Sequence, residues 1–237
     1  MNSGTLFLIP TPISDAPMHY VIPEGNKEQL AHITHFLVEK EKPARASLKK
    51  LNLKNSIQDL KLYNIGKYSE SSDYESYFNP IFNGEDMGLL SDAGCPGIAD
   101  PGSELVKLAH QFNIKVVPLV GPSSIFLSLM ASGLNGQNFA FHGYLPVKDK
   151  ERGKKLRELE QISSKTGQTQ IFIETPYRNE QMFETLKKTL RADTKLCMAL
   201  DTTNSNEYIK TLDIAEWKSY QHPSFHKKPC VFLFQTR

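Results

Sequence analysis

The chain has 237 residues, with 28 Lys and Arg against 26 Asp and Glu and a formal net charge of +2. This near balance excludes a polycation that coats nucleic acid over its whole surface, but it leaves room for a local basic patch. Cys95, Cys197 and Cys230 are widely spaced and form no CxxC pair, which indicates reduced thiols rather than a disulfide framework. The N-terminal apolar run is too short for a signal peptide or a membrane span, so we expect a cytoplasmic protein without a membrane association.

In chain order, apolar patterning predicts strands that alternate with helices. In the first half we expect strands at 5–9, 87–90 and 114–120, helices at 27–39, 44–51 and 104–112, and a loop with a helical turn at 64–80. In the second half we expect helices at 125–130, 151–163 and 179–190, and strands at 139–144, 170–173, 196–200 and 231–234. The alternation predicts an α/β fold. A turn at 118–122 divides it into two domains, 1–117 and 118–237.

The stretch LLSDAGCPGIADPGSELV (89–106) concentrates glycine and proline between a predicted strand and a predicted helix. Glycine permits positive φ and lets a ligand approach the backbone, while proline stiffens the turns. Such a loop is typical of the carboxyl edge of a parallel strand, where open α/β sheets bind ligands. The alternative is an ordinary surface connection, although most of these run only about 2–6 residues.

A second motif, GPSSIFLSLMASGL, begins at Gly121. Pro122 has a helix-compatible φ, Ser123 or Ser124 can cap the first amides, and Gly133 is placed to end the helix. The amino terminus of such a helix favours negative charge.

Four motifs in the order SDAGCPGIADPG, VGPSS, GYLP with basic residues, and IETPYR resemble those of the tetrapyrrole methylase superfamily. Within it they are similar to the branch containing ribosomal small-subunit RNA 2′-O-methyltransferase I, which typically reads SDAGTP…SDPG, PGPSA, GFLP and ESPHR. The similarity runs from Gly4 to about Glu216. The resemblance implies two α/β domains with S-adenosylmethionine in the cleft between them, usually in a homodimer. This is not the Rossmann methyltransferase fold, and the absence of GxGxxG after the first strand agrees with that.

The resemblance also assigns cofactor contacts. Cys95 stands where the family often has threonine, and we interpret it as a small filler against the ligand rather than a nucleophile, because no activating His or Lys is adjacent. The implied cofactor-binding residues are Pro12, Ser91, Asp92, Ala93, Gly94, Cys95, Ile98, Ser123, Ser124, Glu174, Thr175 and Thr202.

The acceptor side departs from the family pattern. A hydroxyl acceptor benefits from a base. Glu39 matches the glutamate of the family's EDTR motif and is the candidate catalytic residue. The segment EKEK (39–42) follows the EDTR pattern only in part. A solvated turn is the alternative for this segment. The chain reads DTTN (201–204) where the branch has ELTK, and Tyr177 replaces the histidine of ESPHR.

The basic segment KDKERGKKLR (148–157) comes just after GYLP and predicts contacts with RNA phosphates. The alternative is a helix start whose charges face water. The histidine pairs His32/His35 and His222/His226 lack further ligands, so we expect no metal site. The candidate substrate-binding residues are Lys148, Lys150, Arg152, Lys154, Lys155 and Arg178.

These observations favour an S-adenosylmethionine-dependent methyltransferase that 2′-O-methylates ribosomal RNA, with the small ribosomal subunit as its partner. One alternative acceptor is a tetrapyrrole-like or other small molecule. A second alternative, motivated by the altered EDTR and ELTK positions, is a non-catalytic paralogue that binds cofactor or RNA.

Overall fold

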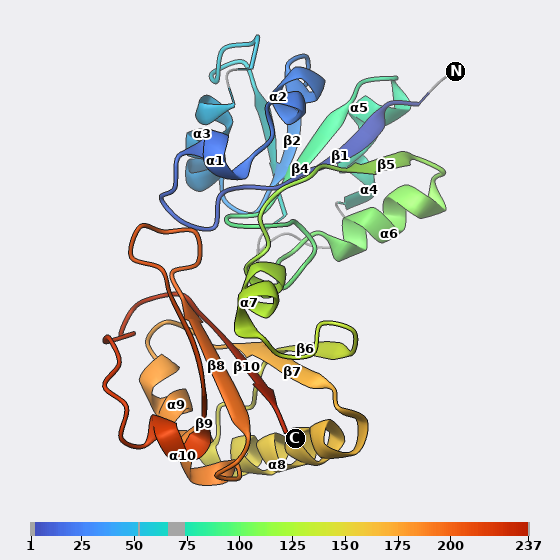
Figure 1. Ribbon diagram of the computed structural model, residues 1–237. Coiled ribbons are helices and arrows are strands. Elements are labelled where there is room, and N and C mark those ends of the chain that lie inside the picture. The colour runs from blue at the N-terminus through green and yellow to red at the C-terminus, as the bar shows by residue number, and fades with distance from the viewer. Residues whose placement is uncertain (1–2, 52, 66–73, 237) are drawn as a thin grey trace. The chain divides into compact units, whose positions relative to one another are not determined.

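The computed structural model describes residues 3–51, 53–65 and 74–236. The chain divides into two compact units, Met1–Ser123 and Ser124–Arg237, each with its own five-stranded sheet (Figure 1). The division expected between residues 117 and 118 falls inside β5 (Lys115–Pro118), which pairs with the first strand of the chain. β5 therefore completes the first sheet, and the chain leaves this unit only after it.

The sheet of the first unit is parallel throughout, in the order β3-β2-β4-β1-β5. Every residue of β2 and β4 is buried. Central strands of a parallel sheet are covered on both faces and therefore read as continuous apolar runs. The strands that precede β5 are β1 (Thr5–Ile9), β2 (His35–Val38), β3 (Lys61–Asn64) and β4 (Met87–Leu90).

Helices cover both faces of this first sheet. Phe36 packs in one apolar cluster with Leu48, whereas its neighbour Leu37 packs in another with Leu105. Successive strand residues point to opposite faces, so each cluster fills one face. The helices of this unit are α1 (Met18–Val21), α2 (Glu24–Leu30), α3 (Glu41–Lys50), α4 (Tyr74–Tyr77), α5 (Asn79–Phe82) and α6 (Ser103–Gln111).

The helix expected at 27–39 is wrong. α2 ends at Leu30, and the apolar run at 35–38 forms β2 instead. A strand buried on both faces shows no alternation, so its pattern cannot be told from that of a buried helix. Part of the loop expected at 64–80, residues 66–73, lies outside the described residues, and α4 and α5 follow it.

The sheet of the second unit is mixed, in the order β6-β7-β10-β8-β9. β6 and β7 are parallel, and the remaining neighbours are antiparallel. The half-buried β9 was not expected from the sequence; it lies at one edge of this sheet and pairs with β8 alone. The strands are β6 (Phe139–Tyr144), β7 (Thr169–Ile173), β8 (Lys195–Leu200), β9 (Tyr208–Asp213) and β10 (Cys230–Gln235).

Two apolar clusters cover the faces of this second sheet. One contains residues of α8 (Asp149–Thr166), α9 (Asn179–Thr189) and α10 (Ile214–Trp217), and the other contains residues of α7 (Ser124–Ser132) (Figure 1). α7 ends before Gly133, which has φ +70°, as the sequence predicts. Gly167 ends α8 in the left-handed conformation.

Candidate functional site

The loops that follow β1 and β4 lie at the carboxyl edge of the first sheet and are bonded to each other. Thr11 and Gly94 form an isolated antiparallel bridge, with N···O distances of 2.9 and 3.1 Å. The Thr11 hydroxyl donates to the carbonyl of Ser91 at 3.3 Å. These bonds tie the glycine loop to the loop that follows β1.

Gly94 has a conformation that other residues rarely adopt. Its φ is +77°, and an added Cβ would lie 3.3 Å from Cγ2 of Ile13. Next to it, the Cys95 thiol donates to the carbonyl of Pro122 at 3.4 Å, and burial raises the pKa of this thiol. The thiol therefore stays protonated at neutral pH, which suits a packing group rather than a nucleophile.

Charged side chains from the ends of β2 and β4 form a cluster at this edge. The Lys40 ammonium pairs with Asp92, and it lies 3.5 Å from Oε1 of Glu39. The hydrogen bond to Asp92 raises the pKa of Lys40. Burial, reinforced by the charge of Glu39, raises the pKa of Asp100 to about 6, although a hydrogen bond from Ser91 acts in the opposite direction. We define these five residues as the carboxyl-edge cluster.

Sequence reasoning missed Lys40 and Asp100. Asp100 belongs to the ADPG segment of the glycine loop, and its place in this motif could have marked it as a site residue. The sequence could not show that its side chain is half-buried. Of the expected cofactor residues, Ser91 is buried, Pro12, Asp92 and Ser123 are half-buried, and Ile98 is exposed. Gly94 is buried, Cys95 is half-buried and Ala93 is exposed.

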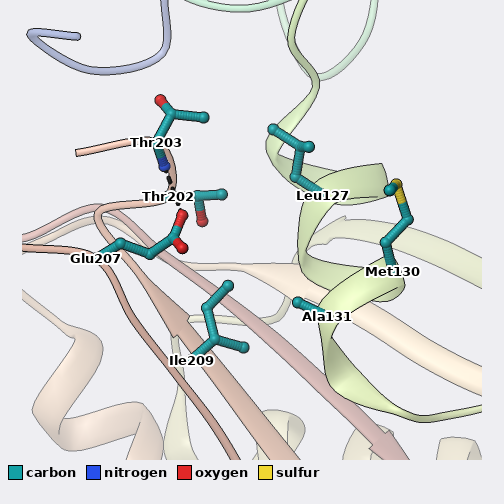
Figure 2. Close-up of a pocket in the computed structure, with 7 residues that line it drawn as sticks. All are labelled: Leu127, Met130, Ala131, Thr202, Thr203, Glu207 and Ile209. Carbon is teal, nitrogen blue, oxygen red and sulfur yellow. Dashed lines mark hydrogen bonds between the residues drawn. The ribbon is translucent and has the colours of Figure 1, made fainter. Parts of the chain in front are cut away.

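The second unit contains a pocket of about 310 Å³ (Figure 2). Residues of α7 form one wall, and the β8–β9 connection with the start of β9 forms the other. Its volume is at the lower end of the range for small-molecule sites, roughly 300–1,000 Å³. It is lined by Leu127, Met130, Ala131, Thr202, Thr203, Glu207 and Ile209.

The loop beside this pocket is strained. Asp201 and Thr203 have φ values of 48° and 72°, and positive φ is a genuine outlier for a β-branched residue such as threonine. The backbone N–H of Thr203 donates to Glu207 at 2.7 Å, which holds the loop in this conformation (Figure 2). Such strain persists where the surroundings over-determine the backbone, and it clusters at ligand sites.

Glu174 and Arg178 bind to each other at the end of β7. The Glu174 side chain is fully buried, and its Oε1 accepts from the N–H of Thr175 at 2.6 Å and from Nε of Arg178 at 3.0 Å. Its Oε2 is buried without a hydrogen-bond partner among the described residues. This carboxylate orders the loop and neutralises Arg178, which weakens Arg178 as a phosphate contact.

The expected RNA-binding residues of the basic segment do not share one environment. The side chains of Lys148 and Lys154 are about four-fifths exposed, Lys155 is partly exposed, and Lys150 is exposed. Glu151 and Glu158 of the same helix lie within 3.5–4.0 Å of the ammonium groups of Lys148, Lys154 and Lys155. The basic surface is therefore partly neutralised by its own helix.

Arg152 is a correction to the sequence analysis. It is only 1% exposed, and its guanidinium donates to the carbonyl of Val147 at 2.9 Å, to the Thr185 hydroxyl at 3.1 Å and to Asp149. A side chain enclosed in this way cannot contact an RNA phosphate. Arg152 faces the interior because its position on α8 is on the packed side of the helix, next to the buried Gly153 and Leu156.

Across residues 3–51, 53–65 and 74–236, no three His, Cys, Asp or Glu side chains gather into a group that could hold a metal ion. None of the helices in these ranges is both long enough and apolar enough to cross a membrane.

Comparison with known proteins gives consistent matches, although no protein-family model matches the chain. It is 31% identical to ribosomal RNA small subunit methyltransferase I of Vibrio cholerae over 211 residues, which are 89% of this chain and 69% of that protein. It is 30% identical to the protein of the same name from Buchnera aphidicola over 238 residues, covering 98% of this chain and 78% of that one.

Among solved structures, the methyltransferase CobJ superposes with a TM-score of 0.65 at 14% identity, covering 99% of this chain and 95% of that one. Uroporphyrin-III C-methyltransferase from Thermus thermophilus, complexed with S-adenosylhomocysteine, superposes with a TM-score of 0.55 at 14% identity, covering 98% and 97%. At such identities the likeness shows the fold, which is that of the tetrapyrrole methylases and not the Rossmann methyltransferase fold.

Proposed function

We propose, since the chain belongs to the ribosomal RNA small-subunit methyltransferase I family, that it transfers a methyl group from S-adenosylmethionine to a ribose 2′-hydroxyl of small-subunit ribosomal RNA. The observation that carries this proposal is the match to curated relatives over as much as 98% of the chain. The cofactor, the acceptor and the site residues below are parts of the same proposal, as are a homodimer and a cytoplasmic location.

The residues at two places fit the cofactor. Around Gly94 a Cβ would fill the space beside Ile13, so glycine keeps this stretch of backbone open to a ligand. The pocket of the second unit has apolar side chains for a flat base, with Thr202 and Glu207 as polar partners. The proposed contacts are Pro12, Ser91, Asp92, Ala93, Gly94, Cys95, Ile98 and Ser123 on the first unit, with Ser124, Glu174, Thr175 and Thr202 on the second.

When bound, S-adenosylmethionine supplies a methyl group that its sulfonium already activates. The chain's own task is then to hold an acceptor at near-attack distance, about 3–3.5 Å, and to exclude water. The carboxylates of Glu39 and Asp92 favour a nearby cation electrostatically, and Lys40 holds both carboxylates in position. Glu39 remains a candidate catalytic residue.

Exposed lysines on and beside α8 support an RNA acceptor. Their ion pairs with Glu151 and Glu158 are solvent-exposed, and exposed pairs are worth only about 0–1 kcal/mol. Phosphates can therefore displace them. If Lys148, Lys150, Lys154 and Lys155 each contact one phosphate, the log–log dependence of binding on salt has a slope of about −3 to −4.

Transfer of tritium from labelled S-adenosylmethionine to small ribosomal subunits that lack their native methylation tests the acceptor. We expect label in the RNA at a ribose. No label, with protein that still binds S-adenosylhomocysteine in a calorimeter, would overturn the RNA assignment and favour the non-catalytic alternative. If a labelled small molecule binds with an affinity that does not depend on salt concentration, the result would instead favour a metabolite as the methyl acceptor.

A melting experiment tests the cofactor separately. S-adenosylhomocysteine at about 100 times its dissociation constant stabilises a folded protein by about 2.7 kcal/mol. No shift of the transition at that dose would refute cofactor binding.

A further inference from the structure

Two loops of the second unit meet at an exposed tyrosine. Tyr177 lies between β7 and α9 and is 72% exposed. The loop just before β10 carries His226, whose ring lies 6.4 Å from that of Tyr177 in an edge-to-face arrangement. The next residue, Lys227, places its ammonium 6.0 Å from the centre of the Tyr177 ring. We define these three residues as the Tyr177 cluster.

Backbone contacts hold the two loops of this cluster together. The N–H of Lys227 donates to the carbonyl of Pro176 at 3.1 Å, and the side-chain amide of Asn179 donates to the carbonyl of Lys228 at 2.6 Å. Lys227 also has φ +61°, a conformation that persists only where the surroundings over-determine it. Because its backbone is already fixed, Tyr177 loses little conformational freedom when it binds a ligand.

The ammonium beside this ring is not neutralised by an acidic neighbour. In the part of the chain that the structure describes, no Asp or Glu oxygen lies within ion-pair distance of Lys227, whereas Lys228 lies 3.6 Å from Asp201. The lysines of α8 differ, because Glu151 and Glu158 of their own helix pair with them. An exposed aromatic ring beside an unpaired cation suits a base and its phosphate.

The Tyr177 cluster lies on the loops that carry proposed cofactor contacts of the second unit. Tyr177 comes two residues after Thr175 in the loop that follows β7. On the other loop, Lys228 pairs with Asp201, which directly precedes Thr202. A strand bound on the Tyr177 cluster therefore passes along loops of the proposed site.

We propose that Tyr177 stacks on an unpaired base of the RNA strand that carries the methyl acceptor, while Lys227 contacts a phosphate of the same strand. This inference rests on the proposed function. Stacking of this kind tolerates any base, because every base has a π-face. It requires a base that is splayed out of a helix, as bases in single-stranded loops are. The second unit thereby selects unpaired RNA, which the charges of α8 alone cannot do.

The first test measures binding of an oligouridylate of about 10 nucleotides with one 2-aminopurine at its centre. Stacking quenches the fluorescence of 2-aminopurine, and we expect this quench with the wild-type protein. Tyr177→Ala should abolish the quench and lower the affinity about 5- to 100-fold, whereas Tyr177→Phe should keep the affinity within about threefold. Tyr20→Ala is the matched control, because Tyr20 is 76% exposed and its ring also lies beside a histidine, His19, at 4.5 Å. The control should keep both the quench and the affinity.

A second measurement separates the ring from the charge. Lys227→Met removes the proposed phosphate contact, so the log–log dependence of binding on salt should become shallower by about 0.7. Tyr177→Ala removes no charge and should leave this slope unchanged. Lys218→Met, at an exposed lysine of the same unit, should also leave the slope unchanged.

Four results would overturn the role of Tyr177 alone, in a wild-type protein that transfers tritium to small ribosomal subunits. The first is an unquenched 2-aminopurine, and the second is an unchanged affinity of Tyr177→Ala for the oligomer. The third is equal binding of the oligomer paired with its complement. The fourth is a molar mass by light scattering that changes in Tyr177→Ala, because the ring would then lie between two copies of the chain.

The state of the variant and the proposed function are checked separately. Tyr177 is exposed, so Tyr177→Ala should keep the wild-type urea midpoint and bind S-adenosylhomocysteine within about threefold of the wild-type affinity. Weaker binding of S-adenosylhomocysteine would place Tyr177 in the cofactor site and overturn its assignment to RNA. If the wild-type protein transfers no methyl group to RNA, the proposed function fails and this inference fails with it.

Discussion

The buried Arg152 offers a direct test of which basic residues serve the fold and which serve RNA. Replacing it by methionine keeps an unbranched side chain in the same space but removes the guanidinium. The change deletes the hydrogen bonds to Val147 at 2.9 Å and Thr185 at 3.1 Å, together with the pair to Asp149. We expect the second unit to become less stable.

The size of the effect follows from what each partner loses. Hydrogen bonds to charged groups contribute about 1.5–3 kcal/mol each, but burying the guanidinium costs part of that gain. Its Nε also lacks an acceptor among the described residues. Asp149 is 73% exposed, so water solvates it once Arg152 is gone, and the full penalty for an isolated buried charge does not apply. We therefore expect Arg152→Met to lower the free energy of unfolding by about 2–3 kcal/mol.

Urea denaturation followed by circular dichroism measures this loss. With an m-value of about 2 kcal/mol/M, the midpoint should fall by roughly 1 M. Lys154→Met is the control, because Lys154 is on the same helix but 78% exposed. Substitutions at such surface positions usually change stability by less than about 0.5 kcal/mol. RNA affinity should behave in the opposite way, with Lys154→Met lowering both the affinity and the salt slope.

An Arg152→Met protein with an unchanged urea midpoint but weakened RNA binding would refute this reasoning. It would mean that Arg152 reaches the RNA and that its hydrogen bonds inside the unit contribute nothing.

Three further changes probe the glycines and the pocket. Gly88→Ala places a Cβ about 2.5 Å from Ile9 Cδ1. This overpacking should lower the free energy of unfolding, measured in urea, by about 1–3 kcal/mol. An unchanged urea midpoint would show that β4 can shift to make room. Gly94 has φ +77°, so Gly94→Ala should lower the free energy of unfolding by about 1–2 kcal/mol. The variant should also bind S-adenosylhomocysteine at least tenfold more weakly in a calorimeter. Undiminished affinity would show that the glycine loop is not part of the cofactor site. Ala131→Trp should fill the pocket and weaken the binding of S-adenosylhomocysteine at least tenfold, with little change in the urea midpoint. An affinity equal to that of the wild-type protein would show that the pocket holds no part of the cofactor.

Local sequence was sufficient to predict the structure wherever the backbone conformation depends on the limits of a single residue. Glycine and proline marked the loop after β4, and Gly133 marked the end of α7, because positive φ and a fixed φ are properties of single residues. The strands at 87–90 and 139–144 lie as predicted. The glycine-loop and IETPYR motifs follow β4 and β7, so their candidate residues lie after strand ends, as predicted.

Properties that depend on distant partners required the tertiary structure. The run at 35–38 is a strand because β3 and β4 lie on either side of it, and its own pattern permits a helix equally well. Arg152 is buried because Thr185, 33 residues later, packs beside it. Lys40 pairs with Asp92, 52 residues away. The pKa of Asp100 is raised first by burial, with the charges of Glu39 and Asp92 acting in the same direction. Burial and charge are set by whatever the folded chain brings together, and no window of sequence contains that information.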